Sequence, residues 1–388
     1  MTTLRAGNDV RLLVGGGEYF PALEAALDAA REEIYLETYI FENDATGSRI
    51  AAALARAARR GVATQVLIDG FGCRRMAAPL AQLMKDAGVQ LLVYRPDIAN
   101  FNLRRSRLRR LHRKLVVLDA HVGFVGGINI IDDMHTPGHV PPRVDFAVQV
   151  RGPIVDDAHA AVTRLWAIIS WTEFRRRWRE WALRCAPNAP AGNQRAAVVI
   201  RDNIGHRRDI EDAYLEAIAG ARSEIIIAMA YFLPGIRFRR TLSDAAARGV
   251  RVVLLLQGRV EYFFLRHASR ALYGSLLDAG IEIQEYHKSF LHAKVAVIDG
   301  HWATVGSSNI DPFSLLLARE ANVVVDDRAF AGQLRASLLG LIEEGARPVI
   351  RERWSKQPLL ARSLAWVSYG IFRVSTGLLG YGKEHESA

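Results

Sequence analysis

The chain contains two copies of one structural unit, and this internal repeat constrains its fold more than any other feature. Residues 24–69 and 213–257 show the same order of features: a helical stretch, an apolar strand, a second helix and a second strand. Farther along, residues 112–129 match residues 292–309, and the second segment lies 180 residues after the first. The sequence therefore predicts two similar lobes related by pseudo-twofold symmetry.

Both copies alternate apolar strands with helices of about ten to fifteen residues, a pattern typical of α/β layering. We therefore expect an α/β fold in which the functional site lies at the seam between the lobes. Pro, Gly and Asn cluster in residues 186–193, which favours a boundary there. The expected organisation is a first lobe in residues 1–190, a second lobe in residues 191–354, and an amphipathic, membrane-associating segment in residues 355–388.

The charge balance indicates an anionic partner. Lys and Arg number 51 against 41 Asp and Glu, which gives a formal net charge of +10 and a pI near 9.8. Nucleic acid and an anionic lipid surface both satisfy this inference. Cys73 and Cys185 are far apart and outside any metal-ligand spacing, so we expect no disulfide framework and no zinc site.

The two ends of the chain predict how it meets a membrane. The N-terminal residues lack the basic and apolar regions of a signal peptide. Residues 359–382 are apolar and aromatic, but Arg362 and Arg373 interrupt them and Lys383 follows them. The uninterrupted stretches are about ten residues long, whereas a bilayer span needs about 20. We expect the protein to lie on a membrane without crossing it.

The best-matched part of the repeat carries chemical side chains. Its first copy has His112, Lys114 and Asp119 in a His-x-Lys-x4-Asp pattern, followed by a glycine turn at Gly126 and then Asn129. Residues two apart in a strand point to the same face, so the His and the Lys project together while the intervening apolar residues pack inside. A glycine turn lets the backbone approach a phosphate closely, and an asparagine amide can donate to it.

The second copy repeats this pattern with identical internal spacing. His292, Lys294 and Asp299 are followed by a turn that contains Ser307 and then by Asn309. A single His-x-Lys pair is commonly an exposed polar strand edge, but two copies that share a glycine turn and an asparagine are hard to obtain from packing alone. We therefore interpret both copies as parts of one catalytic site.

The duplicated pattern resembles the signature of the phospholipase D superfamily, and the resemblance implies both fold and mechanism. It implies two lobes, each a mixed β-sheet flanked by helices, that bring the motifs together. One histidine, expected to be His112, attacks phosphorus to form a phosphohistidine, and the other, His292, acts as general acid and then base. Lys114 and Lys294 would balance the charge on phosphorus, together with the phosphate-binding residues Asn129, Asn309 and Ser307. No metal or other cofactor is implied.

Further positions carry over from the same resemblance. Asp145 and Glu320 match the family's histidine-orienting carboxylates, although a surface acid at a strand start is the alternative for Asp145. Asp119 and Asp299 complete the motifs and are grouped with the catalytic residues, but they lie beyond the chemical face and are expected to fix turn or lobe-interface hydrogen bonds. Gly127 stands where the second copy has a serine, which makes the site asymmetric.

Other phrases resemble bacterial cardiolipin synthases, especially the B type. They are Arg-Asp-Asn from Arg201, Ala-Tyr-Phe ending at Phe232, and the run from His301 to Pro312. This likeness covers nearly the whole chain. It implies transfer of a phosphatidyl group from phosphatidylglycerol or phosphatidylethanolamine to phosphatidylglycerol, at the cytoplasmic face of the bacterial inner membrane and by peripheral attachment to an anionic lipid surface.

Four segments would add a membrane surface. Residues 102–114 hold six arginines among leucines, and residues 166–184 mix tryptophan with arginine; residues 261–265 and 359–382 are apolar and aromatic. The alternatives are a solvated helix face for the first segment and a core helix for the second and the last. Competing functions are a hydrolytic phospholipase D, a phosphodiesterase nuclease of the same superfamily, and a noncatalytic lipid-binding protein. We expect no nucleic-acid partner.

Overall fold

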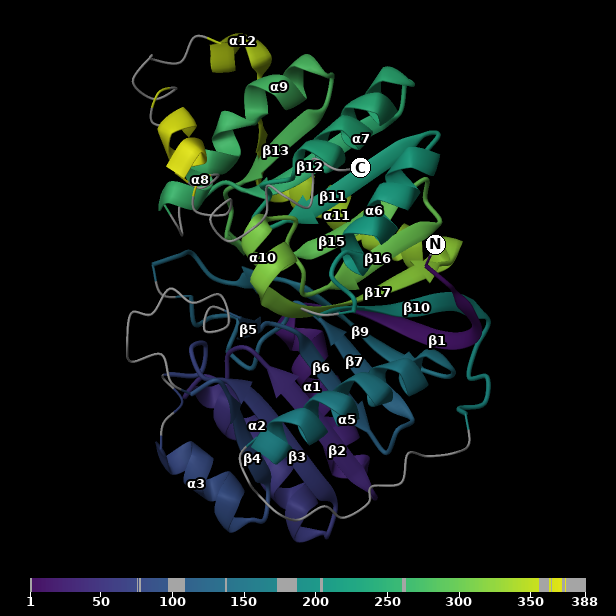
Figure 1. Cartoon of the computed structure of the whole chain (residues 1–388), viewed down its shortest axis with the longest axis vertical. Helices are drawn as coiled ribbons and strands as arrows, with labels where there is room; N and C mark the ends of the chain where they lie inside the picture. The colour runs from purple at the N-terminus through teal and green to yellow at the C-terminus, as the bar shows by residue number, and fades with distance from the viewer. Residues whose placement is uncertain are drawn as a thin grey trace.

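A computed structural model gives the architecture of the chain (Figure 1). It describes residues 2–74, 76, 78–96, 109–136, 138–172, 187–202, 205–259, 263–355, 363, 365–371 and 374. Most of the basic segment 102–114, the tryptophan and arginine run after residue 172, and much of segments 261–265 and 359–382 lie outside the described residues.

The first repeat supplies one half of a large sheet, with helices between its strands. Its elements are β1 (Arg5–Val14), α1 (Gly15–Ala29), β2 (Glu33–Thr38), α2 (Ala45–Arg59), β3 (Ala63–Asp69), α3 (Ala78–Asp86), β4 (Gln90–Tyr94), β5 (Arg110–Leu111), β6 (Lys114–Leu118), β7 (Val122–Gly126), β8 (Arg143–Val144), β9 (Phe146–Arg151) and α5 (Ile154–Thr172).

The second repeat follows the same order. Its elements are β10 (Gln194–Arg201), α6 (Asp209–Gly220), β11 (Glu224–Met229), α7 (Ile236–Ala247), β12 (Arg251–Gln257), α8 (Phe263–Ala271), α9 (Tyr273–Asp278), β13 (Glu282–Tyr286), β14 (Phe290–Leu291), β15 (Lys294–Ile298), β16 (Trp302–Gly306), α10 (Pro312–Leu317), β17 (Ala318–Asp326), α11 (Arg328–Gly345), β18 (Ala346–Pro348) and α12 (Arg351–Ser355).

The two halves join edge to edge through β1 and β10, which pair antiparallel at the centre. From there the first half runs β1-β9-β7-β6-β2-β3-β4 and the second runs β10-β17-β16-β15-β11-β12-β13-β18. Within each half the inner strands pair antiparallel and β2-β3-β4 or β11-β12-β13 pair parallel. The predicted α/β fold of two similar lobes with mixed sheets is confirmed. The exact lobe boundaries stay predictions.

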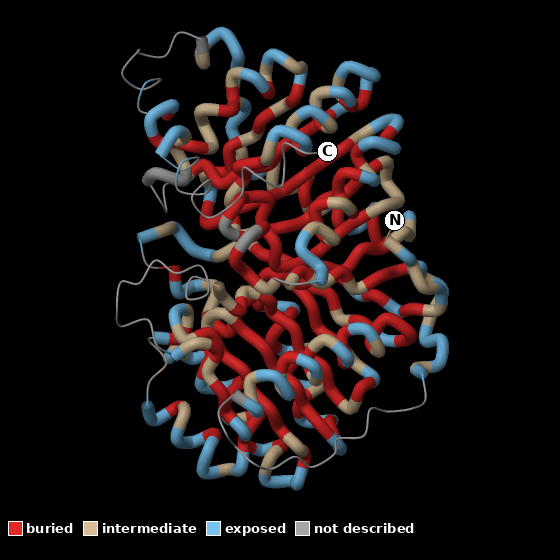
Figure 2. The backbone as a smooth tube through the Cα atoms, viewed as in Figure 1, coloured by how far each residue is buried: buried red, intermediate tan, exposed pale blue. Residues whose placement is uncertain are grey.

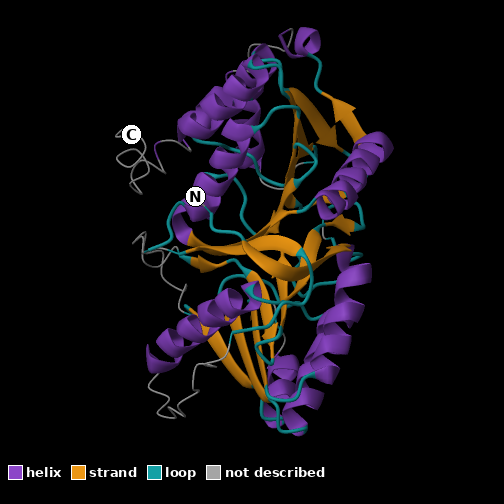
Figure 3. Cartoon of the chain, turned by 90° about the vertical axis from the view of Figure 1, so that its right-hand side faces the viewer, coloured by secondary structure: helices purple, strands orange, loops and turns teal. Residues whose placement is uncertain are grey.

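Helices cover both faces of the sheet, as the turned view in Figure 3 shows. The strands between them are almost continuously buried, which explains their apolar, β-branched sequences (Figure 2). One core cluster joins Val10 and Val148 of the first half with Ala196, Val323 and Phe330 of the second. One hydrophobic core therefore continues across the seam between the lobes.

Turn chemistry fixes the matched ends of the helices. Gly61 and Gly249 both have a φ of +89°, one residue beyond the C-caps of α2 and α7 that immediately precede them, a conformation in which a side chain would be strained. Each of these glycines stands in an Arg-Gly-Val sequence, at residues 60–62 in the first repeat and 248–250 in the second. The repeat seen in the sequence is thus a repeat of backbone geometry. None of the described helices is long and apolar enough to cross a bilayer.

Candidate active site

His112 is held by a strand of the other lobe. It follows β5, which pairs in parallel with the start of β17, and its backbone N–H donates to the carbonyl of Arg319 at 3.0 Å. Its ring Nδ1 lies 2.9 Å and 3.1 Å from the two carboxylate oxygens of Glu320. Glu320 is fully buried, so this contact fixes the ring and directs its Nε2 away from the carboxylate.

His292 is held in the same way by the first lobe. It follows β14, which pairs in parallel with β8, and its N–H donates to the carbonyl of Val144 at 2.8 Å. Its Nδ1 lies 2.6 Å from Oδ2 of Asp145. In the sequence each carboxylate follows the histidine of its own repeat, whereas in the structure each contacts the histidine of the opposite repeat.

Backbone contacts show that Asp145 and Glu320 are equivalent positions. The N–H of Gly127 donates to the carbonyl that follows Asp145 at 2.9 Å, and the N–H of Ser307 donates to the carbonyl that follows Glu320 at 3.0 Å. A Cβ at Gly127 would overlap the carboxylate of Asp145. The glycine therefore leaves room for the shorter acid, which explains the asymmetry noted in the sequence.

Ser307 does not occupy the phosphate-binding position expected from the sequence. Its hydroxyl is fully buried and donates to Oε2 of Glu320 at 2.5 Å, and it accepts from the N–H of Ala321 at 3.1 Å. Both hydrogen bonds lie on the side of His112 where its Nδ1 contacts Glu320. The serine positions the carboxylate that positions His112.

The two motif lysines are buried beside the histidines. Nζ of Lys294 lies 2.8 Å from Nδ1 of His292 and 3.9 Å from Oδ2 of Asp145. Nζ of Lys114 donates to the carbonyl of His112 at 2.5 Å. Burial lowers the pKa of Lys114 to about 7, so this side chain changes charge near neutral pH.

Burial also sets the protonation of the other groups. It lowers the pKa of His112, and it lowers the pKa of His292 well below the usual value, with further lowering from the charge of Lys294. Burial raises the pKa of Asp145 to about 6. At neutral pH both imidazoles are therefore neutral, which leaves a lone pair on a ring nitrogen for attack on phosphorus.

Asn129 and Asn309 take matching places in the loops after β7 and β16. The Oδ1 of Asn129 accepts from the N–H of Ile40 at 3.1 Å, and that of Asn309 accepts from the N–H of Tyr231 at 3.3 Å. Both side chains are buried. Each amide oxygen therefore joins its loop to the segment that follows β2 or β11.

Asp119 and Asp299 lie apart from the catalytic histidines. Each lies in a turn at the far end of its strand, with φ near +50°, and accepts from three successive backbone N–H groups of its own lobe. These contacts fit the turn role expected for the two aspartates, and the donors belong to the same lobe as each carboxylate. β6 and β15, five residues each, separate them from the histidines, about 16 Å at the usual rise.

Two residues near His112 and Glu320, Tyr39 and Arg201, have no role assigned from the sequence. The Tyr39 ring centroid lies 4.8 Å from that of His112 and 5.3 Å from Nζ of Lys114. Arg201 is buried directly across the sheet from Glu320, where its charge interacts with that carboxylate. For Tyr39 the sequence did contain a signal, because the second repeat has Ala230 at the matching position and so departs from the first.

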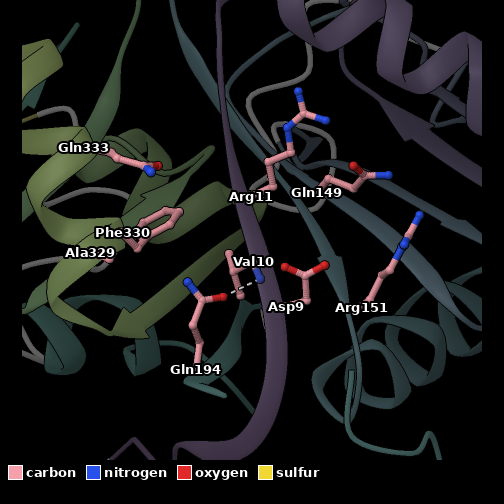
Figure 4. A pocket seen from close by; sticks show the side chains of 9 residues that line it. All are labelled: Asp9, Val10, Arg11, Gln149, Arg151, Gln194, Ala329, Phe330 and Gln333. Carbon is pink, nitrogen blue, oxygen red and sulfur yellow. Dashed lines mark hydrogen bonds between the residues drawn. The ribbon is translucent and has the colours of Figure 1, made fainter. Parts of the chain in front are cut away.

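Two cavities are lined by residues other than the catalytic histidines. One, of about 390 Å³, is lined by Arg11, Gln149 and Arg151 of the first lobe and by Phe330 and Gln333 of α11 (Figure 4). The other, of about 660 Å³, lies between α5, α6 and β10. Among the described residues, no group of three His, Cys, Asp or Glu is arranged to hold a metal ion.

Comparison with known proteins identifies the family. A family model described as "Cardiolipin synthase, PLD-like domain" matches residues 23–136 and 214–341. Cardiolipin synthase B of Escherichia coli strain K12 is 39% identical over 98% of this chain and 92% of its own length. Cardiolipin synthase B of Salmonella typhi is 37% identical over the same shares.

A solved structure shows the same fold. Phosphatidylserine synthase of Haemophilus influenzae Rd KW20 superposes with a TM-score of 0.69 at 12% identity, covering 97% of this chain and 96% of that one. This likeness supports the two-lobed architecture alone, while the sequence matches extend over nearly the full chain. The chain therefore belongs to the cardiolipin synthase family of phospholipase D-like proteins.

Proposed function

We propose that the protein makes cardiolipin by moving a phosphatidyl group from phosphatidylglycerol or phosphatidylethanolamine to phosphatidylglycerol. The observation that carries this proposal is the exchanged pairing of His112 with Glu320 and of His292 with Asp145. It provides two oriented imidazoles with two buried lysines beside them. The similarity over nearly the full chain to proteins named cardiolipin synthase B supports cardiolipin as the product.

In the first step, Nε2 of His112 attacks the phosphorus of the donor lipid. A P–N bond forms, the bond from phosphorus to the headgroup oxygen breaks, and His292 gives its proton to that oxygen. The anionic phosphate raises the pKa of His292 as it binds, which supplies the protonated acid. Lys114, Lys294, Asn129 and Asn309 balance the charge that develops on the phosphate oxygens.

In the second step, the neutral His292 takes a proton from a glycerol hydroxyl of phosphatidylglycerol. The resulting oxygen attacks phosphorus, and the P–N bond to His112 breaks. Both histidines return to their starting protonation states, so the cycle needs no cofactor. Lipid alcohol in place of water at this step distinguishes the synthase from a hydrolase.

The proposal places the enzyme at the cytoplasmic face of the bacterial inner membrane, attached peripherally to anionic lipid. The net charge of +10 supports this, as do four apolar residues near the C-terminus that are more than half exposed, namely Trp366, Val367, Ile371 and Val374.

The test is product analysis by mass spectrometry after incubation with liposomes of phosphatidylglycerol, with or without phosphatidylethanolamine. Cardiolipin with released glycerol identifies phosphatidylglycerol as donor, and cardiolipin with released ethanolamine identifies the other donor. Phosphatidic acid without cardiolipin would mean a hydrolase. If no lipid is consumed and DNA is cleaved instead, the nuclease alternative replaces the proposal.

A further inference from the structure

We propose that six residues around the catalytic histidines form the surface that contacts an anionic bilayer. We call this surface the site rim and define it as Phe71, Arg74, Arg110, Met134, Val140 and Arg143. The inference deepens the proposed function and rests on it, because a lipid-modifying site must face the lipid.

Strand order places the rim on both sides of His112. The central strands of the first lobe lie in the order β7-β6-β2-β3. Because β6 is antiparallel to its neighbours, it starts on the side of the sheet where β7, β2 and β3 end. His112 stands just before β6. Phe71 lies in the loop after β3, and Met134 lies in the loop after β7. Because β6 stands between these strands, the two loops lie on opposite sides of the histidine.

The β3 side of the rim combines an exposed aromatic ring with cations. Phe71 is 42% exposed, and the guanidinium carbons of Arg74 and Arg110 lie 4.4 Å and 5.0 Å from its ring centroid. Arg110 is two residues before His112 along the chain, which links this cluster directly to the catalytic strand. Such a mixture suits a bilayer interface, where the ring enters the headgroup layer and the arginines meet phosphates.

The β7 side repeats this chemistry. Met134 is 65% exposed and Val140 is 40% exposed, and both lie on the loop that leads to Arg143. The Arg143 guanidinium lies 5.5 Å from the ring centroid of Phe290, which stands two residues before His292. In both lobes, the residue two positions before the catalytic histidine therefore takes part in a contact between an arginine and an aromatic ring.

The occupant that fits this rim is a lipid bilayer rather than a nucleic acid. Arginines serve both partners, but the exposed methionine, valine and phenylalanine side chains gain nothing from the phosphate backbone of a duplex, whereas they can enter the acyl boundary. Contact through the rim would also leave a headgroup close to both histidines without lifting a whole phospholipid into water.

The test is flotation of the full chain with vesicles of phosphatidylcholine containing phosphatidylglycerol. We expect the double variant Phe71→Ser, Met134→Ser to bind at least about five-fold more weakly than the parent chain, because its apolar contacts with the acyl boundary are lost. We expect Arg74→Gln to lose most of its preference for vesicles that contain phosphatidylglycerol. Equal thermal unfolding of all variants would show that the fold is retained.

Ile350→Ser is the matched control, because Ile350 is 40% exposed and lies far from the rim. The N–H of the preceding Val349 donates to the carbonyl of Ile283 near the start of β13, on the side of the sheet opposite to the strand ends that carry the site. The control variant should bind vesicles as the parent does. Vesicle binding by the double variant equal to that of the parent chain would overturn the proposal. So would weaker binding of the rim variants to duplex DNA with their vesicle binding unchanged. Flotation needs no turnover, so these outcomes stand apart from cardiolipin synthesis, which is measured separately in mixed micelles.

Discussion

Asp145 of the first lobe holds His292 of the second, with 2.6 Å between Oδ2 and Nδ1, and the reciprocal contact joins Glu320 to His112. Neither lobe therefore contains a complete catalytic pair. The backbone supports the exchange, because each histidine N–H donates to the residue just before the opposing carboxylate. Each pair therefore requires both lobes to be in place.

This exchange predicts that the carboxylates matter in the lobe to which they do not belong. Asp145→Asn should lower kcat at least about 100-fold, because an amide can present the wrong group to Nδ1 and stabilises an imidazolium poorly. Glu320→Gln should have a similar effect through His112. Steady-state kinetics on mixed micelles measure this, and near-parental kcat in both variants would show that the contacts are not used.

The pKa values near neutrality predict a narrow pH optimum. Asp145 gains a proton as pH falls through its pKa of about 6, and the protonated carboxyl holds His292 less well. Lys114 loses its charge as pH rises through its pKa of about 7, and phosphate stabilisation falls with it. The kcat/KM profile should therefore decline on both sides of this interval. Lys114→Arg should shift the alkaline limb upward, and an unchanged limb would point to another group.

The motif aspartates should affect stability and not chemistry. Asp119→Ala and Asp299→Ala each leave a row of backbone N–H groups without their acceptor, so we expect a loss of about 1–2 kcal/mol in the free energy of unfolding. The folded fraction should keep its kcat within about three-fold, since turn hydrogen bonds do not touch the reacting groups. Urea unfolding and kinetics on the same samples measure both. A large fall in kcat with stability intact would return these residues to the catalytic set.

A buried ion pair is present in the first lobe and replaced by two alanines in the second, so the second lobe shows which residues can take its place. Arg113 and Glu37 are paired in the first lobe, where the second has Ala293 and Ala228. Arg113→Ala leaves a buried carboxylate unpaired and should cost about 3–5 kcal/mol.

The double variant Arg113→Ala, Glu37→Ala imitates the second lobe and should be less destabilised than the single variant. Urea unfolding of the two single variants and the double variant tests this. Additive losses would mean that the two side chains do not interact in the folded protein.

Much of the site could be read from the sequence because its chemistry is local and duplicated. The two-residue spacing puts His112 beside Lys114 at the start of β6, and the glycine turn follows within the same unit. The carboxylates themselves could be predicted, but their exchange could not. It depends on β5 and β8, two residues each, which pair with strands of the other repeat far along the chain.

Two other misreadings have the same origin. Ser307 looks like a phosphate ligand in a linear motif, and only tertiary packing shows that its hydroxyl lies beneath Glu320. Tyr39 has no motif at all, since its contact with His112 arises where β2 ends beside β6. Side chains defined by strand pairing between segments distant in sequence are the part that a linear pattern does not specify.

The most direct test of the account is to trap the covalent intermediate with a phosphatidyl ester of p-nitrophenol, a leaving group that needs no general acid. His292→Ala should release a burst of nitrophenolate equal to the enzyme present and carry a phosphatidyl group on the His112 peptide by mass spectrometry. His112→Ala should give neither a burst nor an adduct. An adduct on His292 in the His112→Ala protein would contradict the assigned roles, and the absence of any adduct in both variants would contradict the phosphohistidine itself.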